Sequence, residues 1–305
     1  MIFKFLYILT LCNLFCYPKR LSNKQVKLIN VSYALDNKYI NFFYTSLYTL
    51  LENSDKYTIY HIYVQVGNSF DINYKVIIKK FEKIYFNCFI HFLDMKNEFS
   101  NLMTGSLSTS TYYRLKLPAQ CLSINRIIYL DCDTIVLKDL TELYTLNFGK
   151  NYILGRLDLL VDQLDSLGVY INNYINAGIL LMDLYNLRKY NYINNFTDYL
   201  HKHNNLKYLK QQDQTLINYI CHNKIGILKP KYHMWPFIDE KELINVNNKF
   251  RIKYKIKEFI RDYYNPFIVH FPGIYKERKY VTKYHKIRNQ YSEKVKNITG
   301  NINKK

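Results

Sequence analysis

The chain has 305 residues, of which 49% are hydrophobic, and its 43 lysines and arginines against 24 acidic residues give a formal net charge of +19. A chain of this length buries about three quarters of the surface that it exposes when unfolded, which is enough for one large domain or two small ones. Because it contains only 9 glycines and 6 prolines, the composition excludes a linker or a disordered protein.

The positive charge indicates partners that carry phosphate: nucleic acid, an anionic lipid or a nucleotide. A general bias toward Lys, Asn, Ile and Tyr explains much of the charge equally well, since the chain also holds 32 tyrosines. Basic residues concentrate near the carboxyl end, at positions 276, 278, 279, 283, 286, 288, 294, 296, 304 and 305. We therefore separate residues 281–305 as a basic C-terminal tail, which is either a solvated face or a surface for an anionic membrane.

The first twenty residues are set apart by an apolar run at positions 5–17. This run is shorter than the roughly 20 apolar residues that span a bilayer, and it fits the core of a signal peptide. No small-residue cleavage site follows, and Lys19 and Arg20 outweigh Lys4, which favours a cytoplasmic globular part. We interpret residues 1–20 as a signal peptide or short membrane anchor. The protein is then membrane-associated or secretory, with the cytoplasmic face of a membrane as the alternative.

The six cysteines show neither the spacing of a zinc site nor that of a disulfide scaffold. Two of them, Cys12 and Cys16, lie in the apolar leader, and the others stand at positions 88, 121, 132 and 221. We expect buried free thiols, because unpaired cysteine behaves as a small apolar residue.

From residue 26 onward the pattern predicts alternating strands and helices. Strands are expected at 26–35, 58–66 and 88–93, and helices at 39–51 and 71–85, the second with Asp71 as its N-cap. This alternation is typical of a parallel sheet covered on both faces. The next strand, 126–130, runs directly into Asp131, Cys132 and Asp133. Ligands bind at the carboxyl ends of strands in open α/β sheets, so these residues mark a candidate site.

The remainder of the chain adds four predicted strands and one helix. The strands lie at 152–156, 179–183, 225–228 and 267–271, and the helix at 211–221. Residues 238–265 are charged and lack clear periodicity, which suggests a peripheral insertion.

The two aspartates after the strand at 126–130 have a definite chemistry. They stand two positions apart and can converge on one hard cation such as Mn²⁺ or Mg²⁺, which prefers oxygen ligands. A nucleotide diphosphate supplies further oxygens, and the metal stabilises it as a leaving group. A capped turn with solvated acids is the simpler alternative. A haloacid-dehalogenase-like phosphohydrolase with Asp131 as nucleophile is another, although Thr134 lies one place too early for that motif.

Several further motifs stand in a fixed order around this pair. They are YALDNKY at 33–39, TYYRLKLP at 111–118, YINAGILL at 174–181, QDQ at 212–214 with Asn218, and VHFPG at 269–273 with Lys276. Together with the Asp-x-Asp segment they resemble glycosyltransferase family 8, and most of all the bacterial lipopolysaccharide galactosyl- and glucosyltransferases. The resemblance covers about residues 28–280, which suggests a catalytic domain over 26–280.

The resemblance implies an α/β, Rossmann-like GT-A fold with a mixed central sheet and helices on both faces. It further implies a retaining hexosyltransferase that uses Mn²⁺, or Mg²⁺ in its place. The donor would be UDP-glucose or UDP-galactose, and the acceptor a glycan, glycolipid or glycoprotein. Nucleic acid is not expected as a partner. A non-enzymatic basic binder of membrane or nucleic acid remains the alternative from another class.

The resemblance also assigns roles to individual residues. Asp131, Asp133 and His270 match the family's metal ligands. The nucleotide-sugar set comprises Ala34, Asp36 and Tyr39 for base and ribose, Arg114 and Cys132, Asn176 and Ala177 for sugar hydroxyls, Asp213 and Gln214 beneath the sugar ring, and Gly273 with Lys276 over the diphosphate. The pattern departs from the family at Asn37 and Lys38, and at Glu277 after the lysine.

Asp213 and Gln214 are the candidate catalytic residues. Gln214 matches the position nearest the anomeric carbon, and an amide is a poor nucleophile, whereas retaining glycosidases use a carboxylate there. We therefore favour same-face attack, in which a diphosphate oxygen takes the acceptor's proton and Asp213 anchors sugar hydroxyls. Trp235 is expected in the core, with an aromatic platform for the acceptor as the alternative.

Overall fold

The computed structural model describes residues 25–100, 102, 108–158, 171, 173–202, 211–237, 239–249, 255–276 and 281–300. The predicted leader at 1–20 lies outside these ranges. Within them, no helix has the length and apolar character needed to cross a membrane.

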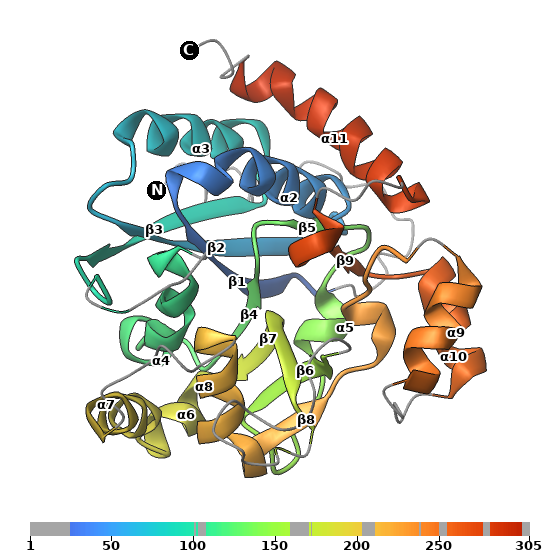
Figure 1. Cartoon of the computed structure of the whole chain (residues 1–305). Coiled ribbons are helices and arrows are strands. Elements are labelled where there is room, and N and C mark those ends of the chain that lie inside the picture. Colours follow the sequence, from blue (N-terminus) through green and yellow to red (C-terminus); the bar gives the residue numbers. More distant parts are fainter. Residues whose placement is uncertain are drawn as a thin grey trace.

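A mixed seven-stranded sheet in the order β3-β2-β1-β4-β7-β6-β8 forms the centre of the described chain (Figure 1). Its strands are β1 Lys27–Leu35, β2 Thr58–Gly67, β3 Cys88–Lys96, β4 Arg126–Leu130, β6 Ile153–Leu157, β7 Ile175–Asp183 and β8 Ile225–Ile227. The first four in chain order run parallel, whereas β7 is antiparallel to both of its neighbours, β4 and β6. The predicted α/β class with a mixed sheet is confirmed.

Helices cover both faces of this sheet. One face packs against α2 (Ile40–Glu52), α3 (Ile72–Ile84) and α11 (Lys283–Thr299). The other carries α4 (Leu117–Gln120), α6 (Leu184–Lys189), α7 (Tyr192–Lys202) and α8 (Gln212–Ile220). In β1 the side chains of Ile29, Val31 and Tyr33 point to the first face and Ala34 to the second, so this apolar strand contributes to both cores.

A separate two-stranded sheet was not expected from the sequence. Its strands are β5 (Thr134–Val136) and β9 (Ile268–His270), and they pair antiparallel with Thr134 opposite His270. β9 falls within the strand predicted at 267–271, whereas β5 was not predicted, because the apolar run at 127–136 is broken only by the turn at Asp131–Asp133. This small sheet brings residue 270 back to the end of β4. It therefore decides the geometry of the site.

Helices also occupy most of the segment at 238–265, so the expectation of no clear periodicity is wrong there. The segment forms α9 (Glu240–Lys249) and α10 (Ile256–Tyr264). In α10 the buried Phe259 and Tyr263 stand four apart on one face and pack with Trp235 and Phe237 in a third apolar cluster. The side chain of Trp235 is 1% exposed, which confirms its expected place in the core.

The described part of the basic tail is the helix α11, and it packs on α2. Tyr48 and Tyr291 lie edge to face at 6.0 Å, and the side chain of Val295 is 3% exposed. The helix begins at a capping box formed by Thr282 and His285. Arg288 donates a hydrogen bond to the carbonyl oxygen of Lys276 at 3.2 Å, so α11 also touches the segment that closes the site.

The cysteines of the described chain, at positions 88, 121, 132 and 221, are all buried thiols, as expected. Burial raises the pKa of the Cys132 thiol well above its usual range, so this residue is a neutral thiol. Its Sγ lies 3.3 Å from the carbonyl oxygen of Ala34 and links the ends of β4 and β1.

The predicted N-cap of α3 is present, because the Asp71 carboxylate accepts the backbone N–H of Asn73 at 2.8 Å. Asp71→Ala should lower the free energy of unfolding by about 1 kcal/mol, measured by urea denaturation. Asp71→Asn keeps an oxygen at the same place and should lose only a few tenths of that, about 0.3 kcal/mol. Equal losses in the two variants would assign the effect to the charge and contradict the cap.

Candidate active site

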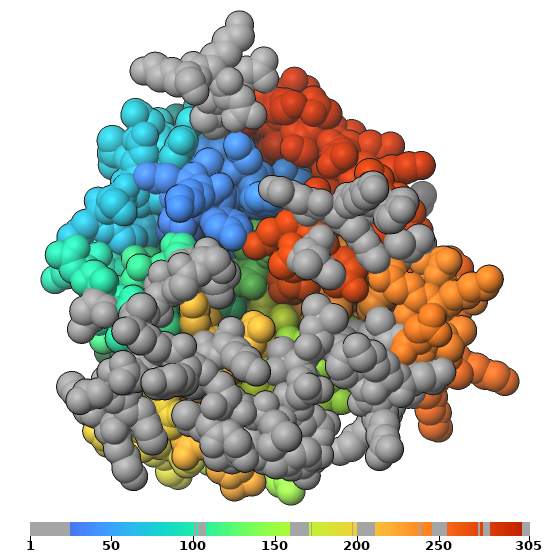
Figure 2. Space-filling model, in the orientation of Figure 1, coloured from blue at the N-terminus to red at the C-terminus, as the bar shows by residue number. Residues whose placement is uncertain are grey.

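A cleft of about 900 Å³, its mouth included, opens at the carboxyl ends of β1 and β4. Every site residue predicted from the sequence lines it, with the single exception of Asp36. In Figure 2, the blue N-terminal segments and the orange-red segments of the last third of the chain meet near the centre of the face of the molecule that is drawn.

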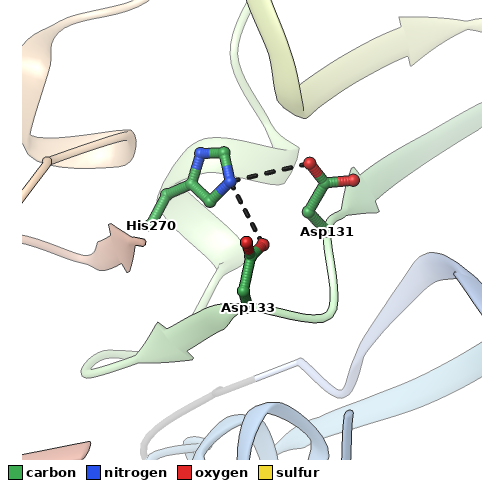
Figure 3. Close-up of side chains that lie close together, drawn as sticks. All are labelled: Asp131, Asp133 and His270. Carbon is green, nitrogen blue, oxygen red and sulfur yellow. Dashed lines mark ion pairs between the residues drawn. The ribbon is translucent and has the colours of Figure 1, made fainter. Parts of the chain in front are cut away.

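Three potential metal ligands converge at the cleft (Figure 3). His270 Nε2 lies 3.6 Å from an oxygen of Asp131 and 3.2 Å from an oxygen of Asp133. One ligand atom from each of the three residues lies within 4.8 Å of the others. The two aspartates occupy the turn between β4 and β5, and the histidine ends β9, so residues 137 positions apart in the chain meet through the small sheet.

The backbone holds these three side chains in place. Asp131 N–H donates to the carbonyl oxygen of Gly178 at 2.7 Å, and Phe271 N–H donates to that of Asp133 at 3.0 Å. Two carboxylates and an imidazole form a donor set that suits Mn²⁺, whereas a purely structural zinc site would use more nitrogen or sulfur. The residues present therefore fit the divalent ion that the sequence predicts.

Gly178 makes room for this cluster. A Cβ at this position would lie 2.2 Å from Cε1 of His270 and 2.8 Å from a carboxylate oxygen of Asp131. Because both partners are held by their own backbone contacts, no larger residue fits without moving a ligand. Gly178, the glycine of the motif at 174–181, is thus required because the side chains of His270 and Asp131 leave no room for a Cβ, and not because the strand is irregular there.

Asp133 and Lys276 form an ion pair at the other side of the cluster. Lys276 Nζ lies 3.0 Å from an Asp133 oxygen and donates to the Tyr39 hydroxyl, also at 3.0 Å. Burial opposes ionisation of Asp133, but His270 and Lys276 outweigh it and lower the pKa of Asp133 to about 2. Likewise Asp133 and Tyr39 raise the pKa of Lys276 against its burial. Gly273, at φ +48°, turns the chain from β9 toward this lysine.

Arg114 is the positive centre of the cleft floor. Its guanidinium pairs with Asp131 at 2.9 Å and with Asp213 at 3.0 Å, and it donates to the carbonyl oxygen of Ala177 at 2.5 Å. Although burial opposes it, the two carboxylates raise the pKa of Arg114. Arg114 is not a surface residue, because it is only 5% exposed. A planar guanidinium presents its N–H donors in a fixed geometry, which lets it hold both carboxylates at once.

Asp213 begins the first turn of α8 and lies fully inside the protein. It accepts a hydrogen bond from the Thr111 hydroxyl at 2.5 Å in addition to its ion pair with Arg114. Burial raises the pKa of Asp213 to about 6, against the opposing effect of Arg114 and Thr111. The carboxylate is thus held at the wall of the cleft by the same arginine that holds Asp131.

The amide of Gln214 has a fixed orientation. Its Oε1 accepts the N–H of Ala177 at 3.0 Å, and its Nε2 donates to a carboxylate oxygen of Asp158 at 3.0 Å. Asn176 donates to the same Asp158 oxygen at 2.9 Å. A carboxylate can only accept, so Asp158 determines which end of each amide points where.

Asp158 is the residue that sequence reasoning missed. It directly follows β6, which runs parallel to β4 because both are antiparallel to β7. Asp158 therefore stands at the same edge of the sheet as Asp131, at the carboxyl end of its strand. The rule that identified Asp131 would also have identified Asp158, since a strand had been predicted at 152–156.

Asp36 is placed differently from the other predicted residues. Its carboxylate caps the 3-10 helix Asn37–Tyr39 by accepting the N–H of Tyr39 at 3.0 Å. It is not among the residues that line the cleft, whereas Ala34 and Tyr39 on either side of it are. In this geometry Asp36 shapes the turn that presents Tyr39 to the cleft.

Comparison with known proteins gives a consistent result. Residues 30–277 match the family described as glycosyl transferase family 8. The chain is 26% identical over 271 residues to general stress protein A of Bacillus subtilis, covering 87% of this chain and 92% of that protein. It is 24% identical over 282 residues to a lipopolysaccharide 1,2-glucosyltransferase of Escherichia coli, covering 85% and 75% of the two chains.

Among solved structures, the fold resembles that of the galactosyltransferase LgtC, crystallised with donor and acceptor sugar analogs. The TM-score is 0.69 at 18% identity, over 87% of this chain and 96% of that one. This likeness establishes the GT-A fold for the described chain.

The contacts of Gly178 give a direct test of the cluster. Gly178→Ala should push His270 away from the two aspartates and weaken Mn²⁺ binding by about tenfold or more, measured by electron paramagnetic resonance titration. Gly226→Ala is the matched control, since a Cβ there would meet only the side chains of Leu154 and Asn151, away from the cluster. It should lower stability and leave Mn²⁺ affinity unchanged. Equal Mn²⁺ affinity in Gly178→Ala and wild type would refute the steric argument.

Proposed function

The chain belongs to glycosyl transferase family 8, and from this membership and the geometry of its cleft we propose that it is a retaining, Mn²⁺-dependent hexosyltransferase. The donor would be UDP-glucose or UDP-galactose. The observation that carries the proposal is the convergence of Asp131, Asp133 and His270 beside a cleft lined by the family's motifs.

The charges of the cleft support a metal-bound diphosphate. Among the described residues that line the cleft, three carboxylates, those of Asp131, Asp133 and Asp213, face two cationic side chains, Arg114 and Lys276. An anionic diphosphate alone would add to an existing excess of negative charge. A divalent ion held by Asp131, Asp133 and His270 would offset that charge and stabilise the diphosphate as a leaving group. Lys276, on the loop after Gly273, lies where it can pair with a phosphate oxygen.

The walls of the cleft would hold the two ends of the donor. Ala34 and Tyr39 line the side of β1, where the proposal places base and ribose. Asn176, Asp213 and Gln214 line the opposite side, where they would hydrogen-bond the hydroxyls of the hexose. Because the Gln214 amide is already oriented by Ala177 and Asp158, a sugar meets a preorganised wall.

The proposed retention of configuration needs a mechanism in which Gln214 is not the nucleophile. An amide whose oxygen accepts from a backbone N–H and whose nitrogen donates to a carboxylate is a poor nucleophile. We propose that the acceptor hydroxyl attacks the anomeric carbon from the side that the diphosphate leaves. The new carbon–oxygen bond forms as the bond to the diphosphate oxygen breaks, and that oxygen takes the hydroxyl proton.

The acceptor is proposed to be a glycan, glycolipid or glycoprotein, as the lipopolysaccharide glucosyltransferase among the relatives suggests. The exposed lysines of α11 support a further proposal, contact with an anionic membrane surface. They are Lys283, Lys286 and Lys294. Such contact would place the enzyme at a membrane, in line with the proposed leader at 1–20.

Membership of the family sets aside the phosphohydrolase and the non-enzymatic binder. The surroundings of Asp131 point the same way. Its carboxylate pairs with Arg114 and accepts the Tyr129 hydroxyl at 3.0 Å, so it is held as a ligand and not freed as a nucleophile.

Purified protein with Mn²⁺ should slowly hydrolyse UDP-glucose or UDP-galactose without an acceptor, measured as UDP release. Asp131→Asn and Asp133→Asn should each lower this rate by about a hundredfold or more, because metal stabilisation of the leaving group is worth several kcal/mol. Asp94→Asn, at an exposed position of β3, is the control and should retain the wild-type rate. Full activity in both cleft variants would overturn the metal assignment.

Asp158 gives a second prediction for the same reaction. Asp158→Ala should release the amides of Asn176 and Gln214 and lower kcat/KM for the donor by about 10- to 100-fold, since small misplacements of positioning groups have effects of this size. Asp158→Asn keeps an oxygen that can accept from both amides and should retain most activity. If Asp158→Asn lowers kcat/KM as much as Asp158→Ala does, the charge of Asp158 matters and not its role as a hydrogen-bond acceptor.

A further inference from the structure

His233 lies directly behind the proposed metal ligand His270. It follows the 3-10 helix Pro230–Tyr232, its side chain is 0% exposed, and its Nε2 lies 2.9 Å from Nδ1 of His270. The residue belongs to none of the motifs that indicated the function, and it does not line the cleft. The question is what this second imidazole does for the first.

The two nitrogens of His270 face different partners. Nε2 points at the carboxylates of Asp131 and Asp133 (Figure 3). Nδ1 lies 2.9 Å from Nε2 of His233. A histidine that binds a metal through Nε2 must offer a lone pair there, so its proton must reside on Nδ1. That Nδ1–H needs an acceptor, and in this structure the atom within reach is Nε2 of His233.

The surroundings of His233 make it a neutral acceptor. Its complete burial and the nearby guanidinium of Arg156 both disfavour a positive charge on this imidazole. A neutral imidazole carries one proton. If Nε2 accepts from His270, that proton sits on Nδ1 of His233.

This arrangement has a cost that an apolar residue would avoid. Nδ1 of His233 is buried and has no hydrogen-bond partner among the residues that the structure describes. A buried donor without a partner destabilises a fold, because it loses its hydrogen bond to water and gains none in return. Packing alone therefore does not account for a histidine at this place.

The backbone fixes the distance between the two rings. Met234 N–H donates to the carbonyl oxygen of Ile268 at 2.9 Å, and His270 N–H donates to the carbonyl oxygen of Met234 at 2.8 Å. The chain after His233 therefore runs alongside β9. His233 and His270 are thus carried by two paired segments, and neither ring needs to move to keep its contact with the other.

We propose that His233 is a positioning residue which accepts the Nδ1–H of His270 and so keeps the lone pair of Nε2 directed at the metal site. The inference rests on the proposed function, since it assumes that Asp131, Asp133 and His270 bind a divalent ion. Partners of this kind orient a metal-bound histidine and raise its basicity, and their removal typically weakens metal affinity by about 10- to 100-fold.

The first test measures Mn²⁺ affinity of the full chain by electron paramagnetic resonance. His233→Leu removes the acceptor and should weaken binding by about 10- to 100-fold. His233→Gln places its Oε1 near the former Nε2 and should restore most of the affinity. Met234→Leu is the matched control: it lies next to His233, is equally buried and should bind Mn²⁺ as the wild type does.

The second test reads the protons directly. In protein labelled with ¹⁵N-histidine and bound to Mg²⁺, which is diamagnetic, long-range ¹H–¹⁵N spectra distinguish a protonated ring nitrogen from an unprotonated one. We expect both His233 and His270 to be protonated at Nδ1, with signals assigned by His233→Gln and His270→Asn. A proton on Nε2 of His233 would overturn the proposal even if His233→Leu fails to fold.

The outcomes separate this inference from the function on which it rests. If the wild type does not bind Mn²⁺, the metal assignment and the role of His233 both fall. If the wild type binds and folded His233→Leu binds equally well, only the role of His233 is refuted. A loss in Met234→Leu as large as in His233→Leu would assign the effect to repacking and likewise refute it.

Discussion

The pairing of β5 with β9 is the constraint on which the site depends. The acids come from the turn after β4, and the histidine comes from a strand near the end of the domain. Backbone hydrogen bonds between the two short strands set Thr134 opposite His270, and the bond from Phe271 to Asp133 continues the contact past the strand end. Because the ladder fixes the backbone on both sides, the side chains of Asp133 and His270 have little freedom to separate. A metal site that joins such distant parts of the chain would not form without this pairing.

The sequence could predict most of the large sheet because its strands are rich in apolar, β-branched and aromatic residues. β4 is found where it was expected, and β1, β2 and β3 differ from the expected bounds only at their ends. The apolar pattern that predicts a strand is weaker where strands are short or begin with polar residues. The sequence predicted this strand to begin at residue 179, because Asn176, Ala177 and Gly178 look like a loop. In the structure, β7 begins at Ile175. These three residues are extended in the structure, and they form the end of β7 that reaches the cleft.

The site divides in the same way. The residues that would touch a donor carry motifs, so a resemblance to a family was enough to name them, and the structure brings nearly all of them to one cleft. The residues that orient them carry no motif. Asp158 was open to inference, since it follows a predicted strand, but His233 was not, because only the fold of the β9 segment brings it to His270. Asp36 differs from the other motif residues, because its carboxylate caps the turn before Tyr39 and it is not among the residues that line the cleft.

These orienting residues share one physical principle. Gln214, Asn176 and His270 each have two chemically different ends, and each could present either end to the cleft. Asp158 removes the choice for the two amides because a carboxylate only accepts, and His233 removes it for the imidazole if it is neutral and accepts at Nε2. The side chains that line the cleft are therefore oriented by Asp158 and His233, which do not line it themselves. A cleft so prepared meets its substrate without reorganising its own hydrogen bonds, which is the condition for electrostatic stabilisation of a departing diphosphate.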